Sequence, residues 1–300
     1  TPEPTPGARR SVVVTGIGAR RAGHGRESLD ALDEPAKAEG TPPDALAGAD
    51  ALDPARARRL DRLARLAADA SAQAFEQAGF PDGDVRLRAG AAVGTMWGSL
   101  DASAAFMKRV LELGATKAMP ADFPNLVLSS AAGHVSIFHA LRGPSWTVSA
   151  FDASGIAAVA SAAEEIETGR ADAMVASAVE VQNLVVERVL DVFPKDETRS
   201  EPRTEGSAAV LLEAEETARA RGTAFLARVV HVGQATWVPG SEDVHQQARI
   251  AALDQLLRVI ARRLPADGVT RPRVYFSRRD ALLMAGVRLA FGDVESEIDI

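Results

Sequence analysis

The 300-residue sequence contains no cysteine, and its aromatic residues make up only 5% of the chain. Without thiols, the chain can form no disulfide, bind no metal through sulfur and use no thiolate as a nucleophile. Five histidines are present, and only His134 and His139 are close in sequence, at a spacing that does not put them on one helical face. The sequence therefore predicts no metal site.

Long apolar runs are also missing, since none approaches the roughly 18 residues of a membrane span. The first ten residues, "TPEPTPGARR", are polar and rich in proline, and no apolar segment of signal-peptide length follows them. The net charge of -7 argues against a general nucleic-acid binder, because phosphate binding needs clustered positive charge. We therefore expect a cytoplasmic protein with a flexible N-terminus over residues 1–10 and no nucleic-acid or membrane partner.

Residues 55–70, "ARARRLDRLARLAADA", hold a dense group of arginines among apolar residues at helical spacing. This pattern is typical of an amphipathic helix with a solvated basic face. The alternative is a docking surface for an acidic partner such as a carrier protein.

Two glycines of "TGIGARRAG", Gly16 and Gly18, resemble the start of a dinucleotide-binding loop. That fingerprint needs a third glycine three residues after the second, and Arg21 occupies the position. No acidic residue closes a clear βαβ unit beyond it. We expect neither a dinucleotide nor any other cofactor.

Strand-like and helix-like segments alternate along the chain, which favours an α/β fold with buried strands. The predicted strands cover 11–18, 88–98, 147–149, 171–180, 206–214, 223–237 and 273–277. The predicted helices cover about 56–78, 100–113, 131–142 and 243–263, with a further helix starting near Ser154.

Residues 147–159, "TVSAFDASGIAAV", predict a strand that turns sharply into a helix, with Asp152 at the turn. Turns of this kind often lift a nucleophile out of a sheet and onto a helix N-terminus. Three interpretations of Asp152 follow: a nucleophile, a helix cap, or the sign that a nucleophile has been lost.

Several of these segments together resemble the β-ketoacyl synthases of the thiolase fold, over about residues 11–237. The resemblance rests on the opening strand and on "AAGHVSIFHALRGPSWTV" (131–148), "GRADAMVASAVE" (169–180) and "TEGSAAVLLE" (204–213), in the family's order. It implies an α/β, thiolase-like layered αβαβα fold forming a single ketosynthase-like domain over 11–300. The N-terminal half would cover 11–214, and a shortened C-terminal half would cover 222–300.

The family's nucleophilic cysteine lies in a Thr-Ala-Cys-Ala-Ser-Gly context, and residues 150–155 here read Ala-Phe-Asp-Ala-Ser-Gly. The resemblance therefore implies that Asp152 stands in the place of the cysteine. A carboxylate is a poor acceptor from a thioester, because the resulting anhydride is the less stable species. As a helix cap, Asp152 would contribute about 1 kcal/mol. As a nucleophile it would need a base to activate water, and a third possibility is an ion pair with an arginine of a partner subunit.

The family's catalytic histidines are also unmatched. Ser277 or Arg278 lies near the first expected histidine, and none of the seven residues after Asp293 is histidine. The resemblance implies that this chain alone does not catalyse decarboxylative condensation.

Inactive members of the family, the chain-length factors, pair with an active ketosynthase. Their interface holds the tunnel for a chain carried on the phosphopantetheine of an acyl carrier protein. The resemblance implies antiparallel pairing through Ser145, Trp146, Thr147, Val148 and Ser149. It implies a tunnel lined by Phe106, Met107, Met119, Phe123, Leu126, Leu128 and Ser129, although each of these could instead belong to the core.

The shortened second half resembles the partner subunits of polyene-forming, highly reducing type II polyketide synthases. Two alternatives remain open. One is an enzyme, decarboxylase or thioesterase-like, that uses Asp152, and the other is a self-paired ketosynthase-like scaffold.

Overall fold

The computed structural model describes residues 9–21, 52, 54–57, 60–192, 205–232, 242–263, 273–275 and 295–297. The chain forms two compact units, one of Thr1–Pro194 with Pro202–Val229 and one of Lys195–Glu201 with Val230–Ile300. Most of the N-terminus predicted to be flexible, as well as Ser277 and Arg278, lies outside the described residues. The division of one domain into halves 11–214 and 222–300 stays a prediction.

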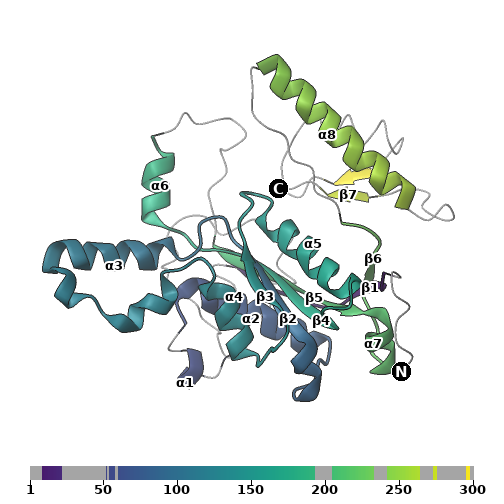
Figure 1. The fold of residues 1–300 in the computed structure, drawn as a ribbon, viewed down its shortest axis with the longest axis horizontal. Helices are drawn as coiled ribbons and strands as arrows, with labels where there is room; N and C mark the ends of the chain where they lie inside the picture. Colours follow the sequence, from purple (N-terminus) through teal and green to yellow (C-terminus); the bar gives the residue numbers. More distant parts are fainter. Residues whose placement is uncertain are drawn as a thin grey trace. The chain divides into compact units, whose positions relative to one another are not determined.

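A six-stranded sheet in the order β3-β2-β4-β5-β1-β6 forms the centre of the first unit (Figure 1). Strands β3, β2 and β4 are parallel, whereas β5, β1 and β6 are joined by antiparallel pairings. The strand bounds are β1 Val12–Arg21, β2 Ala89–Gly94, β3 Ser145–Val148, β4 Ala173–Glu180, β5 Gly206–Ala214 and β6 Ala227–Val229. The predicted α/β class is confirmed.

Helices cover both faces of this sheet (Figure 1). Helices α2 and α4 pack against one another and against the sheet, and α5 packs on β2 and β4 from the other face. The α-helix bounds are α1 Pro54–Ala57, α2 Arg62–Gln77, α3 Leu100–Leu113, α4 Ser130–Phe138, α5 Ser154–Glu167, α6 Leu184–Leu190 and α7 Glu215–Ala220. Short 3₁₀ helices lie at η3 Asp84–Arg88, η4 Ala115–Lys117 and η5 Pro120–Asn125.

The two glycines of the first strand allow close packing between β1 and α2. Gly16 and Gly18 lie within β1, where a Cβ on either would come within 2.0 Å of the carbonyl oxygens of Ala74 and Ala70 in α2. Only glycine therefore lets α2 lie directly on β1 at these points. This contact gives the motif a role in the core.

Several predicted boundaries were wrong for local reasons. The helix predicted over 56–78 is interrupted, and α2 starts at Arg62 because the Asp61 carboxylate accepts the Ala64 N–H at 2.8 Å as an N-cap. The helix predicted over 131–142 ends at Phe138. In the strand predicted over 223–237, only Ala227–Val229 is extended among the described residues. Helices α6 and α7 were not predicted, since both are short.

The second unit contains α8 (Glu242–Arg263) and the parallel pair β7 (Arg273–Tyr275) and β8 (Glu295–Glu297). The predicted helix over 243–263 is confirmed, and β7 covers the first three residues of the strand predicted over 273–277. Across the parts of the chain described above, no helix combines the length and apolar character needed to cross a membrane.

Candidate functional site

The carboxyl ends of β3, β2 and β4 meet at one edge of the sheet, because these three strands are parallel neighbours. The loops that follow them, which begin at Ser149, Thr95 and Val181, therefore lie together. Ligands of α/β proteins commonly bind at such an edge. This edge holds Asp152 and is the candidate functional site.

The predicted strand–turn–helix is present between β3, which ends at Val148, and α5, which begins at Ser154. The Ser154 hydroxyl donates to the Phe151 carbonyl oxygen at 2.6 Å and accepts the Ala150 N–H at 2.9 Å. Phe151 adopts a φ of +51°, in the left-handed region that non-glycine residues rarely occupy. The turn is therefore held by a side chain within its own helix.

Two glycines seat the start of α5 directly on the sheet. A Cβ on Gly94 would lie 2.2 Å from the Ser154 carbonyl oxygen, and one on Gly155 would lie 2.6 Å from Cβ of Ala178. Glycine at both positions brings the first turn of α5 against β2 and β4. The position of the turn is set by this close contact.

Asp152 itself is exposed, and its carboxylate makes no hydrogen bond or ion pair within the described part of the chain. Of the interpretations of Asp152, the helix cap is wrong, because Ala153 is the N-cap residue of α5 and no side chain caps the helix. The hydroxyl of Ser154 bonds only to groups that precede α5, the Ala150 N–H and the Phe151 carbonyl oxygen, so it caps the helix no more than Asp152 does.

Glu180, at the carboxyl end of β4, was missed by the sequence interpretation. Its Oε1 accepts hydrogen bonds from the Thr95 hydroxyl at 3.1 Å and from the Met96 N–H. The Thr95 hydroxyl in turn accepts the Gly98 N–H at 3.0 Å. Glu180 thus fixes the loop that joins β2 to α3, and the available signal was a single acidic residue at the end of a mostly apolar strand.

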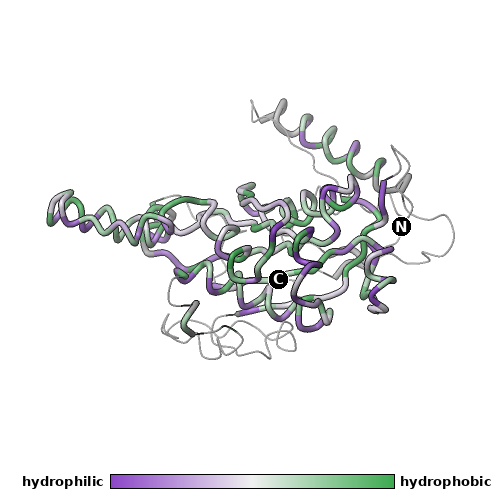
Figure 2. The backbone as a smooth tube through the Cα atoms, turned by 60° about the horizontal axis from the view of Figure 1, so that its bottom comes forward, coloured by the Kyte–Doolittle hydropathy of each residue, from purple (hydrophilic) through white to green (hydrophobic). Residues whose placement is uncertain are grey.

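Residues 100–129, here called the arm, carry all seven predicted tunnel residues. In Figures 1 and 2 the arm extends away from the sheet, and none of the side chains of α3, η4 and η5 is buried. Large apolar side chains are exposed along it, at Met107, Leu111, Leu113, Met119, Phe123, Val127 and Leu128. Phe106 and Leu126 are half-buried, and Ser129 is exposed. The arm therefore does not form part of this unit's core.

Internal contacts give the arm its shape. The rings of Phe106 and Phe123 pack edge to face at 5.8 Å, and Arg109 forms an ion pair with Asp122 at 2.7 Å. The Ser103 hydroxyl donates to the Leu126 carbonyl oxygen at 3.3 Å. These contacts hold α3 against η5 without a buried core.

Polar contacts attach both ends of the arm to the body of the unit. Asp61 accepts a hydrogen bond from the Ser99 hydroxyl, and Nε2 of His134 lies 2.7 Å from Oδ1 of Asn125. Burial lowers the pKa of His134, and the nearby charge of Asp61 opposes this effect. Through its hydrogen bond to Asn125, His134 helps to hold the arm in place.

Strand β3 lies at the edge of the sheet and pairs only with β2 among the described strands. Of the five predicted interface residues, Ser145 and Ser149 are exposed and Trp146, Thr147 and Val148 are half-buried. The Trp146 Nε1–H donates to Ser161 of α5 at 3.1 Å. The other edge of β3 is thus open in this part of the chain.

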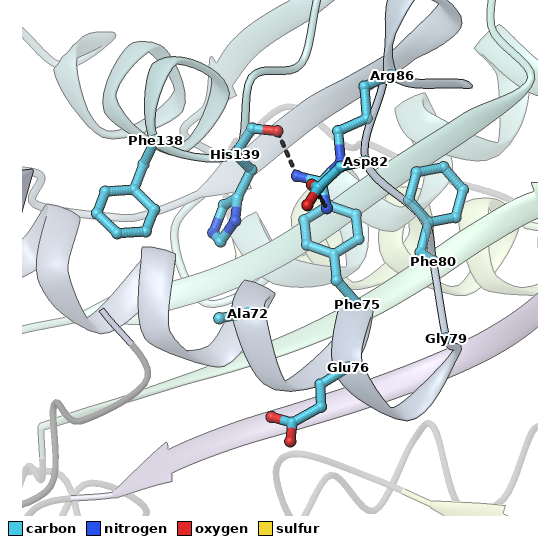
Figure 3. A pocket seen from close by; sticks show the side chains of 9 residues that line it. All are labelled: Ala72, Phe75, Glu76, Gly79, Phe80, Asp82, Arg86, Phe138 and His139. Atoms are coloured by element: carbon cyan, nitrogen blue, oxygen red, sulfur yellow. Dashed lines mark hydrogen bonds and ion pairs between the residues drawn. The ribbon is translucent and has the colours of Figure 1, made fainter. Parts of the chain in front are cut away.

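A hollow of about 340 Å³ lies between α2, η3 and the end of α4, on the face of the sheet opposite α5 (Figure 3). The guanidinium of Arg86 lies over the rings of Phe75 and Phe80, 5.0 and 6.0 Å from their centres, and donates to the carbonyl oxygen of His139. Burial lowers the pKa of Arg86, and Asp82 opposes this effect. The hollow contains no residue of the turn or the arm.

Two arginines of the basic segment bond within the chain. Arg62 forms an ion pair with Glu205, and the Arg65 Nε–H donates to the Ala57 carbonyl oxygen at 3.2 Å. These contacts count against a docking role for both side chains. Among the residues whose placement is described, no three histidine, aspartate or glutamate side chains are grouped as a metal site would require.

Comparison with known proteins extends this description. Residues 30–188, just over half of the chain, match the family described as "Beta-ketoacyl synthase, N-terminal domain". Nodulation protein E of Rhizobium leguminosarum bv. trifolii is 37% identical over an alignment of 186 residues that covers 58% of this chain and 46% of that protein. The 3-oxoacyl-[acyl-carrier-protein] synthase 2 of Vibrio cholerae is 29% identical over an alignment of 196 residues that covers 59% of this chain and 47% of that protein. The chain thus spans about half the length of the curated relatives it matches.

Solved structures resemble the chain over most of its length. The ishigamide ketosynthase/chain length factor gives a TM-score of 0.73 at 22% identity, covering 93% of this chain and 82% of the other. A type II PKS acyl-carrier protein in complex with its ketosynthase gives a TM-score of 0.73 at 19% sequence identity. The match covers 97% of this chain and 85% of the other. The predicted thiolase-like α/β fold is confirmed by these likenesses.

Proposed function

We propose that this chain, which belongs to the β-ketoacyl synthase family, is a non-catalytic chain-length factor. In this proposal it pairs with an active ketosynthase subunit. The pair holds the tunnel for a polyketide or polyene chain that grows on the phosphopantetheine arm of an acyl carrier protein. The condensation chemistry belongs to the partner.

The observation that carries the proposal is Asp152 at the turn where the family resemblance puts the nucleophilic cysteine. Condensation requires a nucleophile that takes the acyl group as a thioester, and the chain has no cysteine at any position. A carboxylate would have to form a mixed anhydride instead, at a cost in free energy. Asp152 is exposed and contacts no histidine among the described residues, so none of those histidines is placed to act on it as a base.

The arm supports a role in a tunnel that two subunits share. Its apolar side chains, including Met119 and Phe123, are exposed in this unit alone, which leaves them available to line a cavity in a partner. Phe123 is 63% exposed although its ring packs on Phe106, so the contact within the arm covers only part of it.

The open edge of β3 supports pairing with a second subunit. An unpaired strand edge offers backbone N–H and C=O groups to another strand. Antiparallel pairing along Ser145–Val148 would satisfy them. The solved structures that share this fold include a ketosynthase/chain length factor and an acyl-carrier protein complex, which supports the kinds of partner proposed.

Co-expression with an active type II ketosynthase subunit tests the proposal. We expect a one-to-one heterodimer whose condensation rate changes by less than about twofold in Asp152→Ala and Asp152→Asn, and whose rate is abolished when the partner's own nucleophile is replaced.

The two alternatives give different results. An enzyme that uses Asp152 would show an activity of the isolated chain that is lost in Asp152→Asn. A self-paired scaffold would purify as a stable homodimer and ignore the ketosynthase. Either result would contradict the chain-length factor proposal.

A further inference from the structure

Phe151 combines two unfavourable features in one residue. Its side chain is 75% exposed, which leaves a large apolar ring in water, and its backbone has a φ of +51°. Left-handed backbone is disfavoured for most residues with a Cβ, asparagine and aspartate being the main exceptions, and it is a marked outlier for a bulky residue. Strain of this kind persists where the surroundings impose it, and it often marks a binding site.

The surroundings of Phe151 do impose it. The Ser154 hydroxyl bonds both to the Phe151 carbonyl oxygen and to the Ala150 N–H. The first turn of α5 cannot shift toward the sheet, because it already rests on Gly94 and Ala178 in close contact. The turn therefore holds the ring of Phe151 away from its own unit.

The neighbours of Phe151 indicate what the ring meets. It lies three residues after the end of β3, the strand whose other edge is open in the described part of the chain. Ile156 on α5 and Ile137 on α4, two helices that flank β3, are 67% and 74% exposed. Large apolar side chains thus surround an open strand edge, the arrangement that a protein partner covers.

We propose that Phe151 is an anchor of the heterodimer interface, its ring filling an apolar recess of the active ketosynthase that pairs along β3. This inference rests on the proposed function. Aromatic anchors seated in pockets dominate the affinity of most protein interfaces. The resemblance puts a small residue at this position, so Phe151 gives this chain a specific means of choosing its partner.

Two measurements separate an interface role of Phe151 from a structural one: the dissociation constant of the heterodimer and the urea midpoint of the chain. The chain is co-purified with its ketosynthase, and the dissociation constant is measured by dilution for the wild type, Phe151→Gly and Phe151→Asn. Glycine and asparagine both tolerate left-handed backbone. We expect each variant to raise the dissociation constant about thirtyfold or more. The urea midpoint of the full chain should stay the same or rise, because the strain is relieved.

Ala140 supplies the matched control, because it is the other non-glycine residue with positive φ, at +55°, in the described part of the chain. Ala140→Gly relieves strain at the end of α4 and removes only a methyl group. We expect its dissociation constant to equal that of the wild type.

Three results would overturn the inference. A Phe151→Gly heterodimer that dissociates like the wild type would show that the ring is not an anchor. A lowered urea midpoint in both Phe151 variants would indicate a structural role. An unchanged dissociation constant with reduced turnover would place the acyl group against the ring instead. Failure of the wild-type pair to form at all would be distinguishable from these, since it would remove the proposed function and this inference together.

Discussion

Nε2 of His134 lies 2.7 Å from Oδ1 of Asn125, so that α4 is joined to η5 at the base of the arm. The arm has no buried side chain in its three helices, and few discrete contacts determine where it lies relative to the sheet. Segments with little apolar burial open more easily than the core does. This hydrogen bond is therefore expected to matter more for the arm than an average surface contact would.

His134 should make the stability of the first unit depend on pH. Burial lowers the pKa of His134 in the folded chain, so the unfolded state binds its proton at a higher pH. Its contribution is fully present above the unfolded pKa of about 6.5. It is lost as pH falls through the lower folded pKa. Asp61 faces the imidazole from the start of α2 and moderates the effect.

Urea unfolding at pH 7.5 and pH 5.5 checks this prediction. The midpoint should fall more between these pH values for the wild type than for His134→Gln, which keeps an N–H donor for Asn125 but does not titrate. All other ionisable groups are common to both proteins and cancel in the comparison. Equal shifts in the two proteins would exclude His134 as the source.

Asp172 should stabilise the first unit through its two arginines. Burial alone would raise the pKa of Asp172, but the hydrogen bonds from Arg88 and Arg10 outweigh it and lower the pKa below its usual range. The stabilisation is therefore present above pH 4, roughly the unfolded pKa, and is lost as pH falls through the folded pKa. Arg10 also bonds to Glu216, so the pair ties the start of β1 to β4 and α7.

We expect Asp172→Asn to lower the free energy of unfolding by about 1–2 kcal/mol at pH 7, a range discounted for partial exposure. The deficit should narrow at pH 3.5. Glu112→Gln is the control, because Glu112 faces Lys108 at 3.9 Å in an exposed pair and should leave the midpoint unchanged. A deficit that is the same at both pH values would mean that packing, and not charge, is responsible.

Gly16→Ala should destabilise the chain through the contact of β1 with α2. The added Cβ would meet the Ala74 carbonyl oxygen at 2.0 Å, which forces the helix away from the strand. Overpacking of this kind costs about 2–3 kcal/mol in unfolding free energy. In Gly133→Ala on α4 the added Cβ meets nothing within 4 Å, so this variant should unfold at the same or a higher urea concentration. Similar losses in both variants would point to a general effect of removing glycine.

The spacing of apolar residues, together with the glycines and prolines that end helices and strands, predicted most elements of the first unit. The strand over 206–214 and the helix over 100–113 match the structure residue for residue. The helix is bounded by Ser99 and Gly114, and the strand begins at Gly206 and runs directly into the charged start of α7. The helix over 56–78 failed at Asp61, whose capping bond restarts the helix and depends on a carboxylate that also accepts from Ser99. Sequence periodicity cannot reveal such a tertiary contact.

The candidate site was predicted only in part. Asp152 was located at the turn, but its interpretation as a helix cap was wrong, because Ala153 is the N-cap residue of α5 and no side chain caps that helix. The strain at Phe151 is a property of φ, which no residue pattern of this turn specifies. Glu180 was missed because its partners, Thr95 and Met96, lie about 85 residues away and meet it only across the parallel strands.

The size of the arm's side chains should set the length of the product. In the proposed complex, Phe123 and Leu126 reach the tunnel of the partner, and a large side chain at its end stops the growing chain. Phe123→Ala and Leu126→Ala each remove several carbons from that end. We expect the product distribution of the reconstituted pair to shift toward longer chains in both variants.

The measurement is mass spectrometry of the products released by equal amounts of heterodimer, with the total condensation rate recorded beside it. Leu87→Ala is the control, since Leu87 is likewise exposed and apolar but lies in η3, outside the arm. It should leave the distribution unchanged. Longer products from the two arm variants alone would locate the end of the tunnel at η5. An unchanged distribution in both, at an undiminished rate, would mean that other residues end the tunnel and that the arm serves only to hold the subunits together.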